Sequence, residues 1–517
     1  MDCDATACYD RIIMSLGSLI SRSFGLHRSI AFLNASTLHQ AKYILKTKLG
    51  VSESFYKHSE LFPIFGSGQG AGNSPGLWCV ISSVIFDLYQ DKANGAHFQS
   101  PDGKYQVHIY MIGFVDDTSG SVNDFCQQEM QPPSHYTALA THDAQRWNDV
   151  LKLTGGALED TKCSYHFLYY DFTISGLPIL RSGKFEPTIC IKFNNATTPT
   201  PLKQLSAHTA HKTLGAHKSP AGNETAAFQK ILAKNKSHCQ IIARSPFNKL
   251  DAWTYYHAIY LPSITYPFPS STLTNDQCQS LQVQVKKSLL PKCGYNRNMP
   301  NAIVYAHSDY GGIHLRTLAV EKGLLQLQPL LTSLRSDGIE HKLALIALSW
   351  AQFLAGTNEP IFENVKQSLP HLAPMKWIPA IRDFLASING TLEMSINFVP
   401  ELQRENDCFL MTQAGLLPFL PTQMLLLNAC RLYLGVTFLS DITNAQGTEI
   451  RIEILQGKVP KFDSHRGLIP YQNVPSQKAW RLWRRLIHTF TLDKTSFLTT
   501  DLGRWFVTGD NTFRKWR

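Results

Sequence analysis

The stretch "KYQVHIYMIGFVDDTSG", residues 104–120, decides the fold, because a run of β-branched and aromatic residues leads into two adjacent aspartates. Such a run followed by Thr-Ser-Gly predicts a strand and a turn. Neighbouring side chains of a regular strand point to opposite faces, so Asp116 and Asp117 can share one ion only if the chain turns at them. Two interpretations stay open: a solvated surface turn, or a hairpin tip that holds Mg²⁺ between carboxylates.

A third carboxylate is needed to hold two metal ions, and Asp4 in "DCDATACYD" (residues 2–10) is the candidate. Two ions about 3.5–4 Å apart activate the attacking oxygen and stabilise the leaving oxygen in phosphoryl transfer. Asp2 and Asp10 are interpreted as structural or surface residues.

The glycine-rich stretch "GSGQGAGNSPG" (66–76) separates these two acidic segments. It fits neither G-x-G-x-x-G nor GxxxxGK[ST], so dinucleotide-binding and P-loop interpretations fail. Its glycines allow backbone to approach a ligand closely, and Pro75 can open the helix that follows. A plain flexible loop is the other interpretation.

Three motifs, in this order, resemble those of the reverse transcriptases of non-LTR retrotransposons. Residues 4–10, "DATACYD", resemble the family's D-x-x-x-A-[FY]-D; residues 69–75, "QGAGNSP", resemble Q-G-x-x-x-S-P; and residues 114–117, "FVDD", resemble [FY]-x-D-D. Weaker similarities follow in "GGALEDTKC", which contains Lys162, and in "KTLGAHKSPAGN", which contains Leu214 and Gly215. The firm resemblance covers about residues 2–222 and a softer one reaches about residue 320.

The resemblance implies a catalytic centre and a cofactor. Asp4, Asp116 and Asp117 would be catalytic and bind two Mg²⁺ ions, with the Ala5 carbonyl as a further ligand. The partners would be an RNA template, a DNA primer and deoxynucleoside triphosphates. The reaction would be RNA-directed DNA synthesis by nucleotidyl transfer to a primer 3′-OH.

The resemblance also implies residues that bind the nucleotide and the primer. The nucleotide-binding residues would be Tyr9 (as steric gate), Gln69, Gly70, Phe114, Val115 and Lys162, and the primer-grip turn would be Leu214 and Gly215. From the residues alone, Tyr9 is equally consistent with a core aromatic and Lys162 with a solvated lysine.

The implied fold class is α+β, with a polymerase palm (an antiparallel sheet with helices) followed by a mostly helical thumb and C-terminal region. We expect the palm over residues 1–222, a thumb-like helical region over 223–320 and a helical region of unknown role over 321–517. Asp4 stands almost at the start, so the fingers region that the family carries before the first motif is missing, and an N-terminally truncated, inactive chain is expected. The alternative function is a noncatalytic fragment that at most binds nucleic acid.

Local patterns predict helices over 36–49 (capped at Ser36 or Thr37), 76–90 and 136–153, strands over 165–175 and 188–193, and mostly helix over 224–290. In "QKAWRLWRRLIHTF" (477–490), Trp480, Trp483 and Ile487 form one apolar stripe, which favours core packing, although base stacking beside arginines stays open. Lys286, Lys287, Lys292 and Arg297 are candidate phosphate contacts, with a solvated face as the other interpretation.

Charge and composition fit these expectations. The net charge is +10, and residues 1–120 carry nine basic against ten acidic side chains, so the excess lies in the rest of the chain, which suits a polyanionic partner. No run of 18 apolar residues occurs, so we expect a soluble intracellular protein without a membrane partner. The 11 cysteines form no CxxC pair, which indicates reduced thiols.

Overall fold

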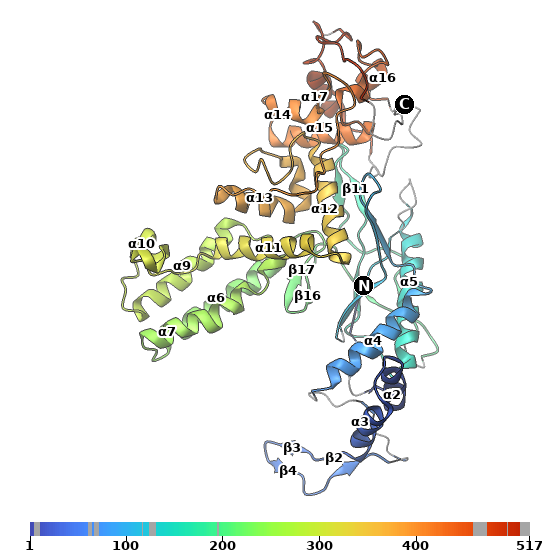
Figure 1. Cartoon of the computed structure of the whole chain (residues 1–517), viewed down its shortest axis with the longest axis vertical. Helices are drawn as coiled ribbons and strands as arrows, with labels where there is room; N and C mark the ends of the chain where they lie inside the picture. The colour runs from blue at the N-terminus through green and yellow to red at the C-terminus, as the bar shows by residue number, and fades with distance from the viewer. Residues whose placement is uncertain are drawn as a thin grey trace. The chain divides into compact units, whose positions relative to one another are not determined.

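The computed structural model describes residues 1–4, 11–59, 61, 65–66, 72–115, 117–123, 131–193, 196–458, 473–493 and 495–506, with Asp4 described in its backbone only. Its N-terminal region carries small sheets, and its C-terminal half is largely helical (Figure 1). The expected α+β class is therefore confirmed. None of the described helices is long and apolar enough to cross a membrane.

The chain divides into two compact units. The first comprises residues 1–98, 108–167 and 183–206, and the second comprises residues 99–107, 168–182 and 207–517. The expected domain boundaries at residues 222 and 320 stay predictions.

A five-stranded sheet organises the first unit, in the order β15-β10-β1-β9-β8. Its strands are β1 (Asp2–Asp4), β8 (Met111–Phe114), β9 (Asp117–Gly120), β10 (Ser164–His166) and β15 (Lys203–Leu205). Neighbouring strands are antiparallel except β10 and β15, which pair in parallel. The sheet was expected to be antiparallel, and it is antiparallel except at the edge strand β15.

Two long helices supply a large part of the first unit's core. They are α4 (Ser74–Gln90) and α5 (Pro133–Leu153), close to the predicted bounds. Ile81 and Ile85 of α4 and Trp147 of α5 are at most 1% exposed and pack with Cys3 of the central strand. Helix α2 (Met14–Ser23) joins the same cluster through Met14 and Ile20.

The helix predicted over 36–49 is wrong. Helix α3 spans Arg28–Gln40, and two short antiparallel ladders follow it: β2 (Lys42–Tyr43) with β5 (Tyr56–Lys57), and β3 (Lys46–Thr47) with β4 (Gly50–Val51). The hydroxyls of Ser36 and Thr37, taken as N-caps, donate to the Leu33 carbonyl from inside the helix, at 3.0 and 2.7 Å. The segment after Gln40 is rich in β-branched and aromatic residues and buries little, so no core face holds it in a helix.

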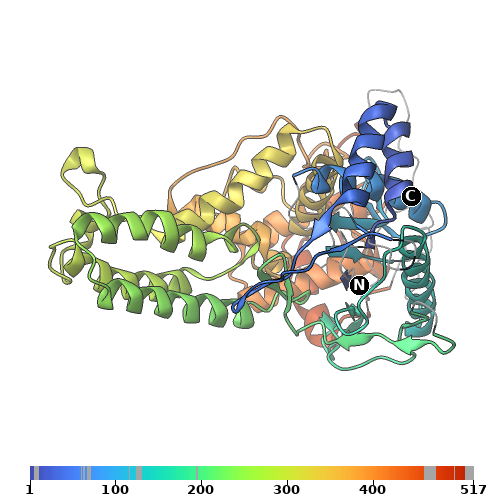
Figure 2. The same ribbon diagram turned by 90° about the horizontal axis from the view of Figure 1, so that it is seen from below.

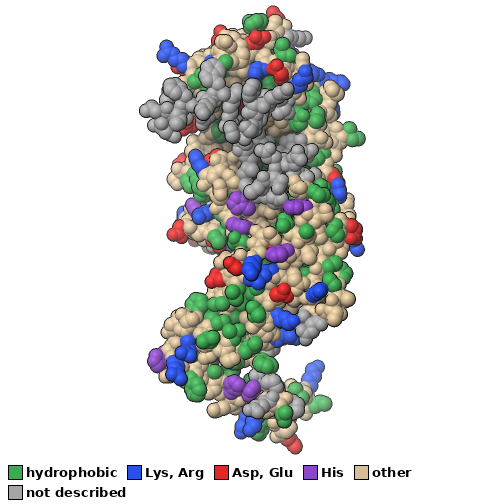
Figure 3. All heavy atoms as spheres, turned by 90° about the vertical axis from the view of Figure 1, so that its right-hand side faces the viewer, with side chains coloured by type: hydrophobic (Ala, Val, Ile, Leu, Met, Phe, Trp, Pro, Cys, Tyr) green, Lys and Arg blue, Asp and Glu red, His purple; other side chains and the backbone are tan. Residues whose placement is uncertain are grey.

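Exposed hydrophobic side chains are frequent in this part of the first unit. Phe32 and Leu33 are 71% and 65% exposed, and Leu49 is fully exposed. Figure 3 shows many hydrophobic side chains on the lower half of the face that it draws. Surface apolar residues of this kind explain why hydrophobicity alone misplaces a core helix here.

The remaining strands form two-stranded ladders. They are β6 (Ala96–Gln99) with β7 (Gln106–Ile109), β11 (Tyr170–Phe172) with β12 (Pro178–Leu180), β13 (Cys190–Ile191) with β14 (Thr200–Pro201), and β16 (His211–Thr213) with β17 (Ala216–Lys218). Strands occur within both stretches predicted at 165–175 and 188–193, which confirms them in part.

The second unit is mostly helical, as expected for 224–290. Its helices are α6 (Thr225–Arg244), α7 (Lys249–Tyr255), the π-helix η1 (Tyr256–Tyr260), α8 (Leu261–Thr265), η2 (Phe268–Ser270), α9 (Asn275–Lys292), α10 (Asn301–Tyr305), η3 (Ser308–Tyr310), α11 (Leu318–Arg335), α12 (Ile339–Ala355), η4 (Pro370–Met375), α13 (Trp377–Ser387), α14 (Leu410–Leu416), α15 (Pro421–Leu434), η5 (Leu439–Ile442), α16 (Ile452–Leu455) and α17 (Gln477–Ile487). Figure 2 shows α6 and α9 side by side.

Three apolar clusters form the core of this unit. One lies between α6, α9 and the segments around η1, a second joins α11, α12 and α13, and a third joins α14, α15 and α17. In the third cluster Trp480 is 5% exposed, and Trp483 and Ile487 are fully buried. The core interpretation of this stripe is therefore confirmed, and these tryptophans are not free to stack on bases.

A buried histidine in this unit makes stability depend on pH. The Nε2 atom of His371 lies 2.9 Å from the Ala355 carbonyl, and its buried Nδ1 has no hydrogen-bond partner in the described part of the chain. Burial lowers the pKa of His371 to about 4, and the charges of Arg431 and Arg382 act in the same direction. The folded protein thus keeps this ring neutral at pH values where an unfolded chain, with a pKa of about 6.5, is protonated.

We expect the free energy of unfolding to fall by roughly 3 kcal/mol through this histidine as the pH drops from about 6.5 to about 4. Urea unfolding at pH 7.5, 5.5 and 4.5 measures the slope against pH. His371→Gln, which retains a donor for the Ala355 carbonyl, should give a flatter profile. Parallel profiles for the two proteins would contradict the assignment.

Candidate functional site

The register of the five-stranded sheet brings several predicted site residues to one end of adjacent strands. The backbone of Asp4 on β1 pairs with Asp117 on β9, and Asp117 pairs with Phe114 on β8. Asp117 is exposed and Phe114 is 60% exposed, so both lie outside the core at this end. Two acidic positions that lie far apart in the sequence are therefore direct neighbours in the sheet.

The turn between β8 and β9 is conformationally unusual. Val115, the residue after β8, has a φ of +58°. A β-branched residue rarely adopts this left-handed conformation, which costs about 1–3 kcal/mol and persists only where the surroundings enforce it. The indole N–H of buried Trp78 donates to the Val115 carbonyl at 2.6 Å. Helix α4, which begins at Ser74 and Pro75, is thereby tied to the turn.

This link between α4 and Val115 was not predicted from the sequence. A tryptophan inside a predicted buried helix needs a hydrogen-bond partner for its indole N–H, and this need indicates that some acceptor must lie beside Trp78. The partner itself could not be named from the sequence, because it is a main-chain oxygen in a distant turn.

Lys162 lies at the same end of the sheet. It is exposed in the turn before β10, two residues ahead of Ser164, which pairs with Asp2. When the antiparallel register is extended by two residues, Lys162 is level with Asp4. A thiol–thiol hydrogen bond between buried Cys3 and Cys163 agrees with this register, and with burial it raises the pKa of the Cys3 thiol.

Leu214 and Gly215 form the turn of the β16–β17 hairpin in the second unit, between paired Thr213 and Ala216. Both residues have a positive φ, 48° and 82°, as in the two-residue turns that are favoured in β-hairpins. The Tyr266 hydroxyl donates to the Leu214 carbonyl at 2.6 Å, and its ring lies 3.3 Å from where a Cβ of residue 215 would be. The turn is thus fixed, and Leu214 is left 42% exposed.

Several predicted residues lie outside the described part of the chain. They are Ala5, Tyr9, Gln69, Gly70 and Asp116, together with the side chain of Asp4. Among the described residues, no group of three or more His, Cys, Asp or Glu side chains is placed to hold a metal ion. The predicted Mg²⁺ ligands are all oxygen donors, which is the chemistry that Mg²⁺ prefers, so the residue types fit this ion.

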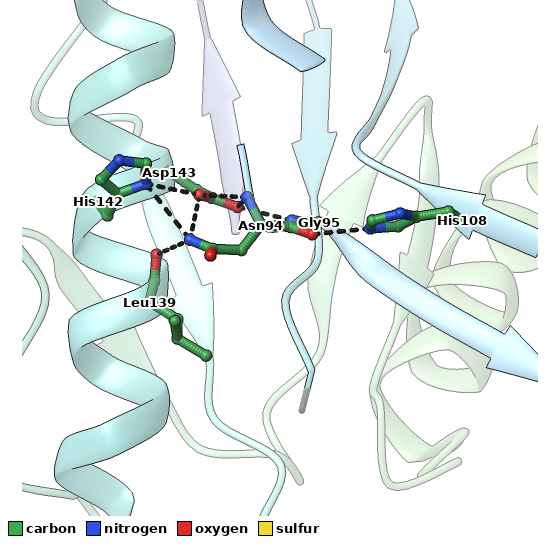
Figure 4. A network of polar contacts seen from close by, with 6 residues as sticks. All are labelled: Asn94, Gly95, His108, Leu139, His142 and Asp143. Atoms are coloured by element: carbon green, nitrogen blue, oxygen red, sulfur yellow. Dashed lines mark hydrogen bonds and ion pairs between the residues drawn. The ribbon is translucent and has the colours of Figure 1, made fainter. Parts of the chain in front are cut away.

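A buried carboxylate supports the loop after α4, which lies near the start of β8 and the end of β9, at the opposite end of these strands from Phe114 and Asp117. Asp143 of α5 is 1% exposed and accepts hydrogen bonds from the main-chain N–H groups of Asn94 and Gly95, at 2.8 and 2.9 Å, and from the Asn94 side chain at 2.8 Å (Figure 4). His142 lies 3.1 Å from the same carboxylate, and His108 lies 2.7 Å from the Asn94 carbonyl. These contacts join α5 to the loop after α4.

The loop has no room for a side chain at residue 95. Gly95 has a φ of +65°, and a Cβ there would lie 2.9 Å from atoms of His108, Ile109 and Tyr110. Only glycine satisfies both constraints without movement of the neighbouring strand.

We expect Asp143→Asn to reduce the free energy of unfolding of the first unit by about 2–4 kcal/mol, because an amide group cannot replace every carboxylate acceptor of these buried donors. Hydrogen exchange of the amides in residues 91–98 should quicken, and mass spectrometry measures it. Asp87→Asn, at an exposed acidic position on α4, is the matched control and should leave that exchange unchanged. Equal exchange in both variants would exclude the supporting role of Asp143.

Comparison with known proteins adds no identification. No family model matches the chain, and no curated protein matches it.

Proposed function

We propose that this chain carries the catalytic centre of an RNA-directed DNA polymerase of the reverse transcriptase class, whose reaction is nucleotide transfer to a primer 3′-OH. The expectation that the chain itself is inactive is untested, and nucleotide incorporation by the chain decides it. The observation that carries the proposal is the backbone pairing of Asp4 with Asp117 beside the strained turn at Val115. Acidic residues directly opposite each other destabilise an antiparallel pair unless something compensates, and a bound cation compensates. Strained turns also cluster at functional sites.

In this proposal Asp4, Asp116 and Asp117, with the Ala5 carbonyl, hold two Mg²⁺ ions. Bound Mg²⁺ supplies Lewis-acid activation of the attacking hydroxyl and neutralises charge on the leaving pyrophosphate.

The neighbouring residues bind and position the substrates. The ammonium group of Lys162 contributes positive charge for the triphosphate, and exposed Phe114 and Val115 provide an apolar surface under the primer end. Tyr9, Gln69 and Gly70 complete the nucleotide pocket. The Trp78–Val115 hydrogen bond keeps the turn in place while substrates bind and leave.

The finer fold assignment belongs to the same proposal. The first part of the chain, to residue 222, is a polymerase palm, and residues 223–320 are a thumb whose α6 and α9 grip the primer–template duplex. The fixed turn at Leu214 and Gly215 would support the primer. The candidate phosphate contacts differ: Lys286 and Lys292 donate to main-chain carbonyls of this chain, whereas Lys287 and Arg297 are exposed. The exposed pair is therefore the better candidate for duplex contact.

A noncatalytic protein that binds nucleic acid is the second candidate function. The exposed Lys287 and Arg297 favour binding but require no chemistry. The catalytic proposal is thus distinguished from this one by nucleotide incorporation alone.

The test is primer extension by the whole chain on poly(rA) primed with oligo(dT), in Mg²⁺ buffer, alongside hybrid binding measured by fluorescence anisotropy. Extension that Asp116→Asn abolishes, with binding retained, supports the polymerase. Hybrid binding without incorporation overturns the polymerase and supports the binding protein. Incorporation that survives Asp116→Asn overturns the proposed catalytic centre.

A further inference from the structure

A cavity of about 660 Å³ lies beside α5 and the β13–β14 hairpin. Helix α5 contributes successive turns to its wall, and the β13–β14 hairpin contributes the opposite side. All of its lining residues belong to the first unit, and they are Thr141, His142, Gln145, Arg146, Asp149, Cys190, Lys192, Ala196 and Pro199. Its volume lies within the range of small-molecule sites.

The cavity carries more positive than negative charge. Arg146 and Lys192 line it together with His142, and Asp149 is the one acidic residue among the described residues that line it. Arg146 Nη2 donates to the Leu88 carbonyl at 2.6 Å, while its buried Nε has no hydrogen-bond partner within the described residues. Part of this guanidinium is therefore held by α4, and because its Nε is buried, a ligand in the cavity would meet its Nη groups.

The wall that carries Lys192 is anchored. Gln145 accepts from the Lys192 N–H at 2.7 Å and donates to the Lys192 carbonyl at 3.3 Å, and Asn148 donates to the same carbonyl at 3.0 Å. Gln145 also donates to Asp149 at 2.8 Å, which satisfies part of that carboxylate. The two basic side chains thus project from a backbone that is fixed before any ligand binds, which lowers the cost of binding.

We propose that this cavity binds a phosphate group, carried by a free nucleotide or by a nucleic-acid strand. A planar guanidinium with free donors and a nearby ammonium suit phosphate oxygens. The cavity exceeds the size of a phosphate alone, and Ala196 and Pro199 give it an apolar side against which a base or sugar can lie. The inference does not rest on the proposed polymerase activity, because none of these residues belongs to that centre.

Cys190 allows a direct test on the whole chain, because it lies in the cavity wall with its side chain partly exposed. Alkylation by iodoacetamide, followed by mass spectrometry, is measured with AMP, with inorganic phosphate and with a short oligo(dT). We expect saturating ligand to slow alkylation of Cys190 by about fivefold or more, because the reagent reaches the thiol only in the fraction of molecules without ligand. Exposed Cys79 on α4 is the internal control and should react at an unchanged rate.

The arms distinguish the two sources of phosphate: protection by AMP indicates a free nucleotide, and protection by oligo(dT) alone indicates a strand. Lys192→Gln should raise the ligand concentration needed for half-maximal protection of Cys190 by about tenfold, because a charge-assisted contact is lost. Arg146→Gln should do the same, and Lys192→Gln covers the case in which Arg146→Gln fails to fold. Asp149→Asn, the matched uncharged variant, should retain or strengthen protection. The proposal is overturned if no probe protects Cys190, or if Lys192→Gln is protected as well as the original chain.

Discussion

Asp117→Asn is expected to lower the rate of primer extension by about 10³-fold or more, because the lost carboxylate removes several kcal/mol of charge stabilisation in the transition state. The structure supplies a matched control on the neighbouring strand. Asp2 lies two residues before Asp4 on β1, pairs with Ser119 and accepts a hydrogen bond from its hydroxyl at 2.5 Å. Asn retains an acceptor for that hydroxyl, so Asp2→Asn should leave the rate within about twofold.

Thermal unfolding separates a catalytic role of Asp117 from a structural one. Asn keeps the size of the side chain and one acceptor oxygen, so Asp117→Asn should leave the melting temperature close to that of the original chain. Loss of activity with a stable fold is the pattern of a residue retained for function. A fall in melting temperature together with the activity would instead give Asp117 a structural role and remove it from the proposed centre.

The sequence predicted best the elements that local patterns determine. Helix α4 follows from Pro75 and a long apolar run, and the stripe of Trp480, Trp483 and Ile487 follows from helical spacing. The helix predicted over 36–49 relied on Ser36 or Thr37 as its N-cap, but both residues lie inside α3, and the segment after Gln40 buries little, with Leu49 fully exposed. Periodicity indicates which residues share a face, but not whether another element covers that face.

The candidate site shows the same division. Asp116 and Asp117 mark a turn from local sequence, and Leu214 with Gly215 marks another. The pairing of Asp4 with Asp117, and the hydrogen bond of Trp78 to Val115, depend on contacts between distant segments. No spacing rule within either segment determines them; the need for a third carboxylate and the family resemblance were what suggested that Asp4 and the aspartate pair belong together.

The second large effect is expected at Arg431 of α15, which is fully buried and forms no ion pair with a carboxylate among the described residues. Its guanidinium donates to the carbonyls of Phe353 and Leu354, at 2.7 and 3.4 Å, and to the Asn428 side chain at 2.9 Å. The two carbonyls belong to the last turn of α12, where the helix dipole favours a cation. Burial lowers the pKa of Arg431 to about 10, so the group stays charged at neutral pH.

Arg431→Met is expected to reduce the free energy of unfolding of this part of the second unit by about 3–5 kcal/mol, because it leaves buried helix-end carbonyls without donors and opens space around Phe353. Hydrogen exchange of the α12 and α15 amides measures the loss locally, which avoids treating the whole chain as one cooperative transition. Arg481→Met, at an exposed position on α17, is the matched control and should change stability by less than about 0.5 kcal/mol. Arg431→Lys retains the charge but cannot reach several acceptors at once, so it should recover only part of the loss. Full recovery by lysine would mean that the positive charge at the helix end, rather than the several hydrogen bonds of the guanidinium, holds α12 against α15.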